Sequence, residues 1–158
     1  MKLKEVSIRP GKPADMQGVF DLIHQLAVYE KAENELVITP ETLVDDGFGE
    51  IPSFEALVAE HEGQIIGMAL YYPTYSTWKG KSWYLEDFVV DENFRGHGVG
   101  KMIFNALVNQ MKERECARLR WQVLDWNEPA IQFYQKIKAE LDETWINCTL
   151  NKSDLEAW

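Results

Sequence analysis

Sulfur and imidazole ligands are scarce in this sequence. It contains two cysteines, Cys116 and Cys148, whose spacing fits neither a metal-binding nor a redox motif. Three histidines are scattered along the chain and form no ligand cluster, so we expect no metal ion: His24, His61 and His97. Isolated thiols are typical of a reducing compartment, and we therefore expect a cytoplasmic protein.

Long apolar runs and excess positive charge are absent as well. No run approaches the length of a membrane-spanning helix, and residues 1–12 lack the apolar segment of a signal peptide. The 26 acidic residues outnumber the 16 basic ones, which gives a formal net charge of −10. Nucleic-acid binding needs a basic face, so we expect neither nucleic acid nor a membrane as partner. An acidic surface attracts cations but also keeps a protein in solution, and charge alone does not separate these roles.

The hydrophobic pattern predicts one α/β domain that spans residues 1–158, with a mixed central sheet flanked by helices. Helices are expected to begin at Asp15, after the Thr39 cap, at Gly98 and at Pro129. Strands are expected at 6–9, 54–60, 64–72, 83–90, 119–124 and 145–150.

A glycine-rich segment follows the predicted strand 83–90. It reads Arg-Gly-x-Gly-x-Gly from Arg95 to Gly100 and leads directly into a helix. Glycines let the backbone approach an anion closely, and the free N–H groups of a helix's first turn can hold that anion. The spacing is not that of the dinucleotide fingerprint, and no Gly-Lys-Ser/Thr ends the segment as in a P-loop. Taken alone, the loop also fits an ordinary glycine-capped turn.

Two motifs together make the sequence similar to the GNAT superfamily of N-acetyltransferases. Arg95, Gly98 and Gly100 match the pattern Arg/Gln-x-x-Gly-x-Gly/Ala, and residues 127–134 resemble the helix Asn-x-x-Ala-x-x-Phe-Tyr. The resemblance implies a GNAT fold and acetyl-CoA as cosubstrate, with the pyrophosphate on the loop and the pantetheine arm along the preceding strand. It assigns the cofactor site to Phe88, Val89, Val90, Arg95, Gly96, His97, Gly98, Val99, Gly100, Lys101, Asn127, Glu128, Pro129, Ala130 and Tyr134.

Further segments resemble the diamine (spermidine/spermine) acetyltransferases and a sister branch that is described as acting on thialysine. They are residues 26–30, 45–49, 75–81, 84–88 and 123–129. This resemblance implies a homodimer, and it points to a substrate site made of Tyr29, Glu30, Trp78, Glu86, Trp121, Gln122, Glu143 and Trp145. Carboxylates would pair with ammonium groups, and aromatic faces would add cation–π attraction. Individually, Trp78 and Trp145 also fit buried anchors, and Glu30 and Glu143 also fit solvated charges.

The expected chemistry needs an acid and a base. An alkyl ammonium of pKa about 10 must lose a proton before its nitrogen attacks a thioester. The resemblance makes Tyr134 the acid that protonates the leaving thiolate, although a Tyr beside Phe133 also fits a core aromatic. Glu86 is the predicted base, acting through a water, and it fits a charge-paired structural carboxylate equally well. Alternation along the strand would send Glu86 and Asp87 to opposite faces unless a bulge intervenes.

The predicted function is therefore transfer of acetyl from acetyl-CoA to a small cationic amine, a polyamine or diamine. Alternatives are a thialysine or lysine-like acceptor, a protein lysine, or a non-catalytic acyl-CoA-binding domain. One departure from the family pattern stands out, because GNAT proteins usually carry a Gly shortly after the Phe-Tyr pair and this chain has Lys138.

Overall fold

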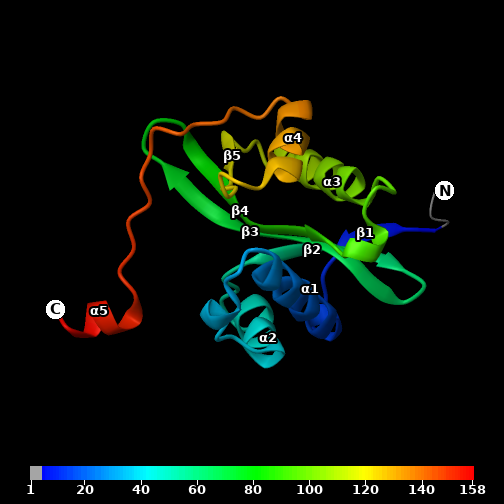
Figure 1. Ribbon diagram of the computed structural model, residues 1–158, viewed down its shortest axis with the longest axis horizontal. Coiled ribbons are helices and arrows are strands. Elements are labelled where there is room, and N and C mark those ends of the chain that lie inside the picture. Colours follow the sequence, from blue (N-terminus) through cyan, green and yellow to red (C-terminus); the bar gives the residue numbers. More distant parts are fainter. Residues whose placement is uncertain (1–4) are drawn as a thin grey trace. The chain divides into compact units, whose positions relative to one another are not determined.

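A five-stranded mixed sheet with the strand order β1-β2-β3-β4-β5 organises the larger part of the chain (Figure 1). The computed structural model describes residues 5–158, which fall into two units, Met1–Trp121 and Gln122–Trp158. The sheet belongs to the first unit, and its first four strands are antiparallel while β4 and β5 are parallel. The strands are β1 (Ser7–Pro10), β2 (Glu55–His61), β3 (Gln64–Ser76), β4 (Gly80–Val90) and β5 (Arg118–Arg120).

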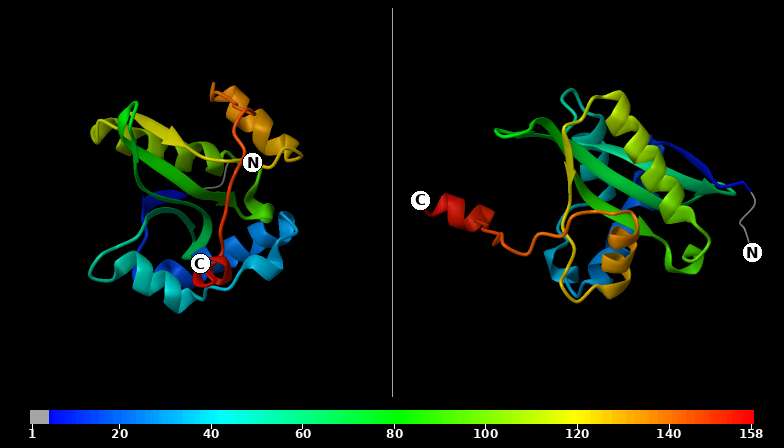
Figure 2. Two further views of the ribbon diagram at one scale, coloured as in Figure 1. Left: turned by 90° about the vertical axis from the view of Figure 1, so that its left-hand side faces the viewer. Right: turned by 90° about the horizontal axis from the view of Figure 1, so that it is seen from above.

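Helices cover both faces of this sheet. The helices α1 (Met16–Tyr29) and α2 (Pro40–Phe48) lie on one face, and α3 (Val99–Glu113) lies on the other (Figures 1 and 2). Apolar residues three and four apart in α1 are buried against strand residues, which is the reason this stripe folds as a helix on the sheet. The core on this face consists of Met16, Val19, Leu22, Ile23, Leu43, Val58, Met68, Leu70 and Val89.

The sequence predicted most helix starts correctly. Thr39 caps α2 by accepting a hydrogen bond from the Thr42 amide at 3.2 Å, and Pro40 is the first helical residue. Gly98 precedes α3 with a φ of 86°, in the left-handed region that favours glycine. Asp15 precedes α1, at the end of a short 3₁₀ helix (Pro13–Asp15). Two further 3₁₀ helices span Glu33–Glu35 and Glu92–Phe94.

Strand ends were predicted less well. The hairpin between β2 and β3 turns at Glu62 and Gly63, which both have positive φ, as a two-residue turn requires. The strands β3 and β4 extend beyond the predicted ranges into a second hairpin, and β5 covers only Arg118–Arg120 instead of 119–124. These ends depend on which neighbour is available for pairing, and the local sequence does not contain that information.

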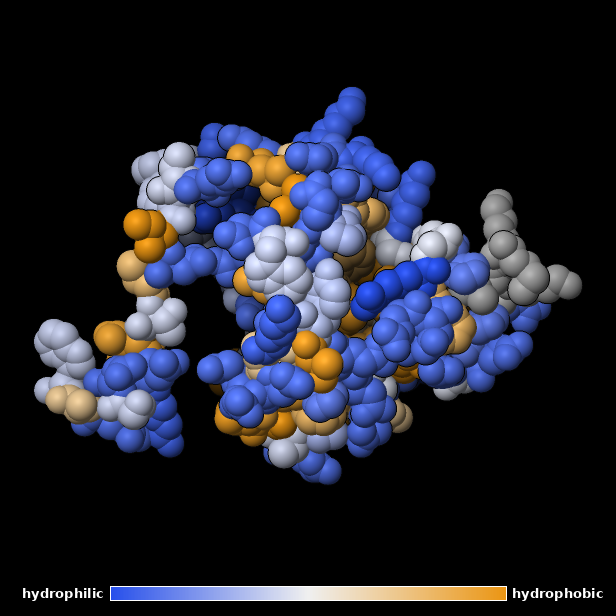
Figure 3. Space-filling model, in the orientation of Figure 1, coloured by the Kyte–Doolittle hydropathy of each residue, from blue (hydrophilic) through white to orange (hydrophobic). Residues whose placement is uncertain are grey.

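The second unit contains α4 (Glu128–Lys136) and α5 (Lys152–Glu156). The prediction of a strand at 145–150 is wrong, because this segment is extended and exposed without a ladder partner among the described residues. Hydrophobic residues are visible along it in Figure 3, and Trp145 is 66% exposed. The residue pattern favours a strand, but a strand forms only where another strand supplies its hydrogen bonds.

Three helices end in the same way, each with a non-glycine residue in the left-handed region. Lys31, Glu115 and Lys138 follow α1, α3 and α4 with φ values of 59°, 52° and 62°. After α4, the Lys138 amide donates to the Gln135 carbonyl at 2.9 Å and the Ala139 amide to the Tyr134 carbonyl at 3.0 Å. This is a Schellman motif, whose left-handed position favours glycine. The glycine that the family pattern expects is thus replaced by a strained lysine.

No helix among residues 5–158 is long and apolar enough to cross a bilayer.

Candidate active site

The loop between β4 and α3 is held by one buried carboxylate. Asp91 accepts a hydrogen bond from the Gln25 side chain at 3.0 Å and one from the Asn93 amide at 2.9 Å. The Gln25 contact holds the loop against α1, and the Asn93 contact stabilises the short 3₁₀ helix Glu92–Phe94 that follows. Beyond it, Gly96 and Gly98 have φ values of 78° and 86°. The predicted cofactor loop therefore rests on a buried support and uses glycine where the backbone requires it.

The first turn of α3 has the properties of an anion site. The amides of Val99, Gly100 and Lys101 begin the helix, where N–H groups lack an intrahelical acceptor. The positive end of the helix dipole points in the same direction. Arg95 donates from Nε to the Val90 carbonyl at 2.9 Å, and its guanidinium lies 5.8 Å from the centroid of the Tyr29 ring. Backbone donors and a cation thus fit the pyrophosphate that the resemblance places here.

The strand β4 leaves part of one edge open. It pairs with β5 only from Ser82 to Tyr84, while β4 itself continues to Val90. Within the described residues no strand lies beside residues 85–90 on that edge. An unpaired edge offers N–H and C=O groups to an extended ligand. This stretch includes Phe88, Val89 and Val90, which were predicted to pair with a pantetheine arm.

A β-bulge in β4 brings two carboxylates together. Tyr71 pairs with Leu85, but the next residue back, Leu70, pairs with Asp87, so Glu86 is the extra residue. The bulge interrupts the alternation that would have sent Glu86 and Asp87 to opposite faces. Asp87 now interacts electrostatically with both Glu86 and Glu30, the residue that caps the C-terminus of α1. The expectation of two separate faces is therefore wrong, for the reason that the sequence analysis named as its exception.

The environments of these acids differ. Burial, with the charges of Glu86 and Glu30, raises the pKa of Asp87 to about 6. Burial also raises the pKa of Glu30 above its ordinary value. Glu86 is exposed, and its carboxylate accepts a hydrogen bond from the Tyr72 hydroxyl at 2.6 Å. Burial, followed by this hydrogen bond, raises the pKa of Tyr72, so its hydroxyl stays protonated and remains a donor.

Aromatic rings pack beside the carboxylates of the bulge and beside β4, the strand that is predicted to bind the cofactor. The rings of Tyr72 and Tyr84 stack with centroids 5.6 Å apart. On the α3 face, Phe104 makes edge contacts with Phe88 at 5.8 Å and with Trp121 at 5.7 Å. The Phe104 ring therefore links Trp121 to Phe88 on β4. Trp78 lies at the β3–β4 turn and is 80% exposed, so the alternative of a buried anchor is wrong for this residue.

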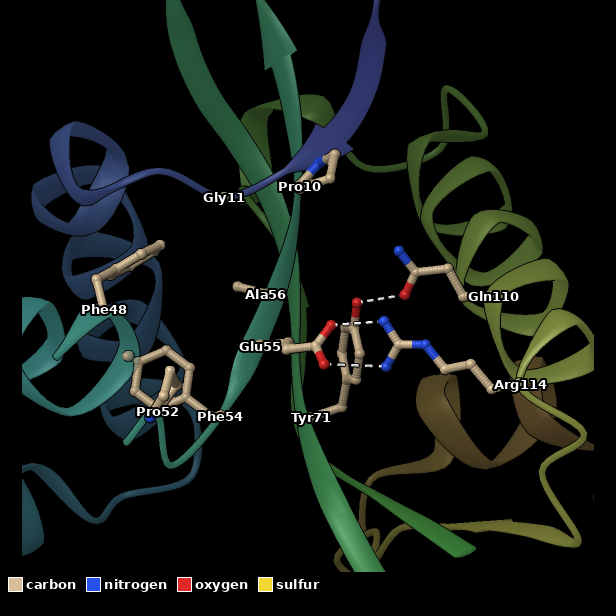
Figure 4. Close-up of a pocket in the computed structure, with 11 residues that line it drawn as sticks. Pro10, Gly11, Phe48, Pro52, Phe54, Glu55, Ala56, Tyr71, Gln110 and Arg114 are labelled. Atoms are coloured by element: carbon tan, nitrogen blue, oxygen red, sulfur yellow. Dashed lines mark hydrogen bonds and ion pairs between the residues drawn. The ribbon is translucent and has the colours of Figure 1, made fainter. Parts of the chain in front are cut away.

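One pocket in the first unit lies away from the predicted site residues. It has a volume of about 250 Å³ and is lined by Phe48 and Phe54 on one side and by Tyr71 on the other (Figure 4). Across it, Arg114 pairs with Glu55 at 2.7 Å, and the Tyr71 hydroxyl donates to Gln110. None of the predicted site residues lines this pocket. Its polar groups already bind one another, which is typical of a structural link between α3 and the sheet.

The second unit contains the remaining predicted residues. Asn127 caps α4, with its side-chain oxygen accepting from the Ala130 amide at 3.4 Å. Tyr134 lies on α4, is buried and contacts Phe133 edge-on. The Gln122 side chain donates to Asn147. Glu143 and Trp145 lie in the exposed extended segment, so the alternative of a buried anchor is wrong for Trp145 as well.

The structure thus brings some predicted residues together and leaves others apart. Glu30 and Glu86 meet around Asp87, and Tyr29 meets Arg95. Trp78 is not joined to this group by any described contact. Sequence reasoning missed Tyr72, whose only signal was its place at the end of a predicted strand. Among residues 5–158 no group of His, Cys, Asp and Glu side chains is arranged to hold a metal ion.

Comparisons with known proteins identify the family of this chain. Residues 23–138 match the model of the acetyltransferase (GNAT) family. The chain is 41% identical over 143 residues to the thialysine N-epsilon-acetyltransferase of Bos taurus, which covers 85% of this chain and 84% of the relative. It is 31% identical to the human spermidine/spermine N(1)-acetyltransferase-like protein 1, over 94% of this chain and 23% of that protein.

Among solved structures, an aminoglycoside N-acetyltransferase in complex with CoA superimposes with a TM-score of 0.74 at 18% identity. The superposition covers 92% of this chain and 95% of that chain, and at this identity it supports the fold alone. Sequence family, fold and the open strand beside the glycine loop lead to one conclusion: the chain belongs to the GNAT acetyltransferase family and is an N-acetyltransferase.

Proposed function

We propose that the chain, as one domain, transfers acetyl from acetyl-CoA to a small amine that carries a second positive charge, with polyamines and diamines as the main class. The observation that carries the proposal is the layout of β4. The bulge carboxylates, Glu86 and Asp87, come immediately before the unpaired edge at Phe88–Val90, and the glycine-rich loop 95–100 follows that edge. At about 3.3 Å per residue, Asp87 and Val90 are about 10 Å apart along the strand.

The chain's own residues would divide the work as follows. The amides at the start of α3 and Arg95 hold the pyrophosphate, and the edge of β4 aligns the pantetheine arm. Acetyl-CoA supplies an activated acetyl thioester. A carboxylate of the bulge takes a proton from the bound ammonium, a role for which the sequence analysis selected Glu86. The Tyr134 hydroxyl gives a proton to the leaving thiolate.

Electrostatics support a dicationic acceptor. Glu30, Glu86 and Asp87 lie together at the C-terminus of α1, where the helix dipole adds partial negative charge. One carboxylate can meet the reacting nitrogen while another holds a remote ammonium and fixes the orientation of the substrate. Tyr29, Trp78, Trp121, Gln122, Glu143 and Trp145 remain candidates for the rest of the substrate site.

A second candidate is a thialysine or lysine-like acceptor. The greater identity to a thialysine acetyltransferase, 41% against 31% for a spermidine/spermine-like protein, favours it. Such a substrate adds a carboxylate that the acidic cluster would repel, unless a basic residue meets it. Lys79 and Lys81 in the β3–β4 hairpin are basic candidates for that contact.

A panel of amines tests both candidates. Initial rates of CoA release should be compared for spermidine, putrescine, thialysine, lysine and a neutral-tailed alkylamine at equal concentration. Dications should exceed the neutral-tailed amine by about fivefold or more, because one retained ion pair contributes on the order of 1 kcal/mol. Glu30→Gln should reduce that preference, and added salt should weaken it. Equal rates for the neutral-tailed amine would refute the electrostatic account.

We also propose that the protein works in the cytoplasm as a homodimer. Both cysteines are free, which is compatible with a reducing compartment. The exposed apolar residues of the extended C-terminal segment support a second copy that covers them, since patches of this kind mark interaction surfaces. Light scattering should give twice the 18.3 kDa of one chain, and a monomeric mass at micromolar concentration would contradict the dimer.

A further inference from the structure

Two neighbouring carboxylates in the bulge of β4 are prepared for different tasks. Glu86 is exposed, and its oxygen is engaged by the Tyr72 hydroxyl at 2.6 Å. Tyr72 is held in turn by its stack against Tyr84. The donated hydrogen bond fixes the position of the Glu86 carboxylate and occupies one of its oxygens.

Asp87 has the opposite surroundings. It is half-buried on β4, and within residues 5–158 no group donates a hydrogen bond to its carboxylate. The charged groups that face it are acidic as well, Glu30 from the end of α1 and Glu86 from its own strand. The hydroxyl of Tyr72, on β3, is directed to Glu86. A carboxylate that has lost water and gained no donor or cation binds a proton more strongly.

We propose that Asp87 accepts the proton from the acceptor ammonium, and that Glu86, positioned by Tyr72, binds the ammonium without taking its proton. This assignment rests on the proposed acetyl transfer and replaces Glu86 as the base. The ammonium R–NH₃⁺ gives one proton to Asp87, and the freed nitrogen pair forms the C–N bond with the acetyl carbon. As the C–S bond breaks, Tyr134 protonates the leaving thiolate, and the second nitrogen proton, passed on through solvent, restores the Tyr134 hydroxyl. Asp87 then returns its proton to solvent.

The basicity of Asp87 suits this task. General-base catalysis is most efficient when the pKa of the base lies near the working pH, and the pKa of Asp87 is about 6. At pH 7 most of this group is ionised and ready to accept a proton. An ordinary carboxylate with a pKa near 4 would be about a hundredfold weaker as a base.

The experiment compares pH profiles of three variants from pH 5 to pH 10 with spermidine as acceptor. Asp87→Asn should lower kcat/KM by about 10²-fold or more and remove the acidic limb near pH 6. Glu86→Gln should keep that limb and raise the KM for spermidine. Tyr72→Phe should do the same to a smaller degree, because it frees Glu86 without removing its charge. Unchanged CoA affinity in all three variants serves as the control for folding.

A readout independent of turnover completes the test. With ¹³C-labelled aspartate carboxyl groups, one resonance should titrate near pH 6 in the wild type and be missing in Asp87→Asn. If Glu86→Gln removes the acidic limb and Asp87→Asn retains it, Glu86 is the base and the proposal is overturned while acetyl transfer stands. If the wild-type protein acetylates no amine in the panel, the proposed function itself fails, and Asp87 has no proton to accept.

Discussion

The first turn of α3 and the last turn of α1 lie beside the same stretch of β4 and offer it opposite charge. At the start of α3, backbone amides and Arg95 present positive charge. At the end of α1, Glu30 adds its carboxylate to those of the bulge. The two ends approach each other where the Arg95 guanidinium lies over the Tyr29 ring. Under the proposed function, the N-terminus of one helix would hold the anionic substrate and the C-terminus of another the cationic one.

The two ends are built differently. The α3 end relies on glycine and backbone, so its geometry follows from a short piece of sequence. The α1 end relies on side chains from β3, β4 and α1 that only the tertiary fold brings together. A change at the first should therefore act on anion binding alone, while a change at the second should alter both chemistry and stability.

A change at neither end should cost as much activity as Asp87→Asn. Tyr134→Phe should lower turnover by about 10²-fold, the usual contribution of a general acid, and leave CoA affinity unchanged because the lost hydroxyl acts on the leaving thiolate. Steady-state rates from pH 6 to pH 10 and CoA titrations measure the two quantities. A normal rate at every pH would remove Tyr134 from the mechanism.

Gly98→Val tests the anionic end. A β-branched residue at a φ of 86° is strained, and relief of that strain would move the first amides of α3 away from the pyrophosphate. CoA affinity should fall by about tenfold to a hundredfold in calorimetric titrations. Gly80→Val is the matched control, because Gly80 has a φ of 94° at the opposite end of β4 and equally open surroundings. Equal loss of affinity in both variants would mean that strain alone is responsible.

Asp87→Asn tests the cationic end through stability. The raised pKa of Asp87 means that the folded protein holds this proton up to about pH 6, whereas the unfolded chain releases it near pH 4. Wild-type stability should therefore fall as pH rises from 4 to 6. Above pH 6 the asparagine variant should be more stable by about 2 kcal/mol in urea unfolding. A more stable but inactive variant would distinguish a functional carboxylate from a structural one.

Asp15 provides a control of opposite sign. The hydrogen bonds from Arg9, at 2.6 and 2.9 Å, hold the pKa of Asp15 below its ordinary value. This ion pair contributes stability above the unfolded pKa and is lost as pH falls. Asp15→Asn should destabilise the protein at neutral pH, and a gain in stability would contradict this account of both carboxylates.

The smallest effect is expected at a helix end where no ligand is proposed. Lys138→Gly should relieve the left-handed strain after α4 and raise the free energy of unfolding by about 0.5–1 kcal/mol. Lys136→Gly, two residues earlier at the last position of α4, should instead lower it by up to about 1 kcal/mol. Urea unfolding of the two variants separates the backbone effect from the loss of a lysine charge. Destabilisation by both would mean that the Lys138 side chain stabilises the fold.

Local signals explain how much of this could be predicted from sequence. The glycines after β4 and the helix start after the Thr39 cap each act within a few residues, and both were predicted. The bulge at Glu86 left no local signal, because it arises from the pairing register with Leu70 and Tyr71. The raised pKa of Asp87 and the Tyr72–Glu86 hydrogen bond follow from that register and were therefore out of reach.

The open edge of β4 has a consequence for the protein before it meets any amine. Exposed strand edges are templates on which other chains can assemble, and soluble proteins usually protect them. Here an extended pantetheine arm would occupy the edge as an added strand, so a saturating pool of acetyl-CoA would protect the chain against self-association as well as supply its reaction. By mass action, about a hundredfold excess of ligand over its dissociation constant adds roughly 2.7 kcal/mol to stability. The bound cosubstrate would then stabilise the folded enzyme and protect it from self-association.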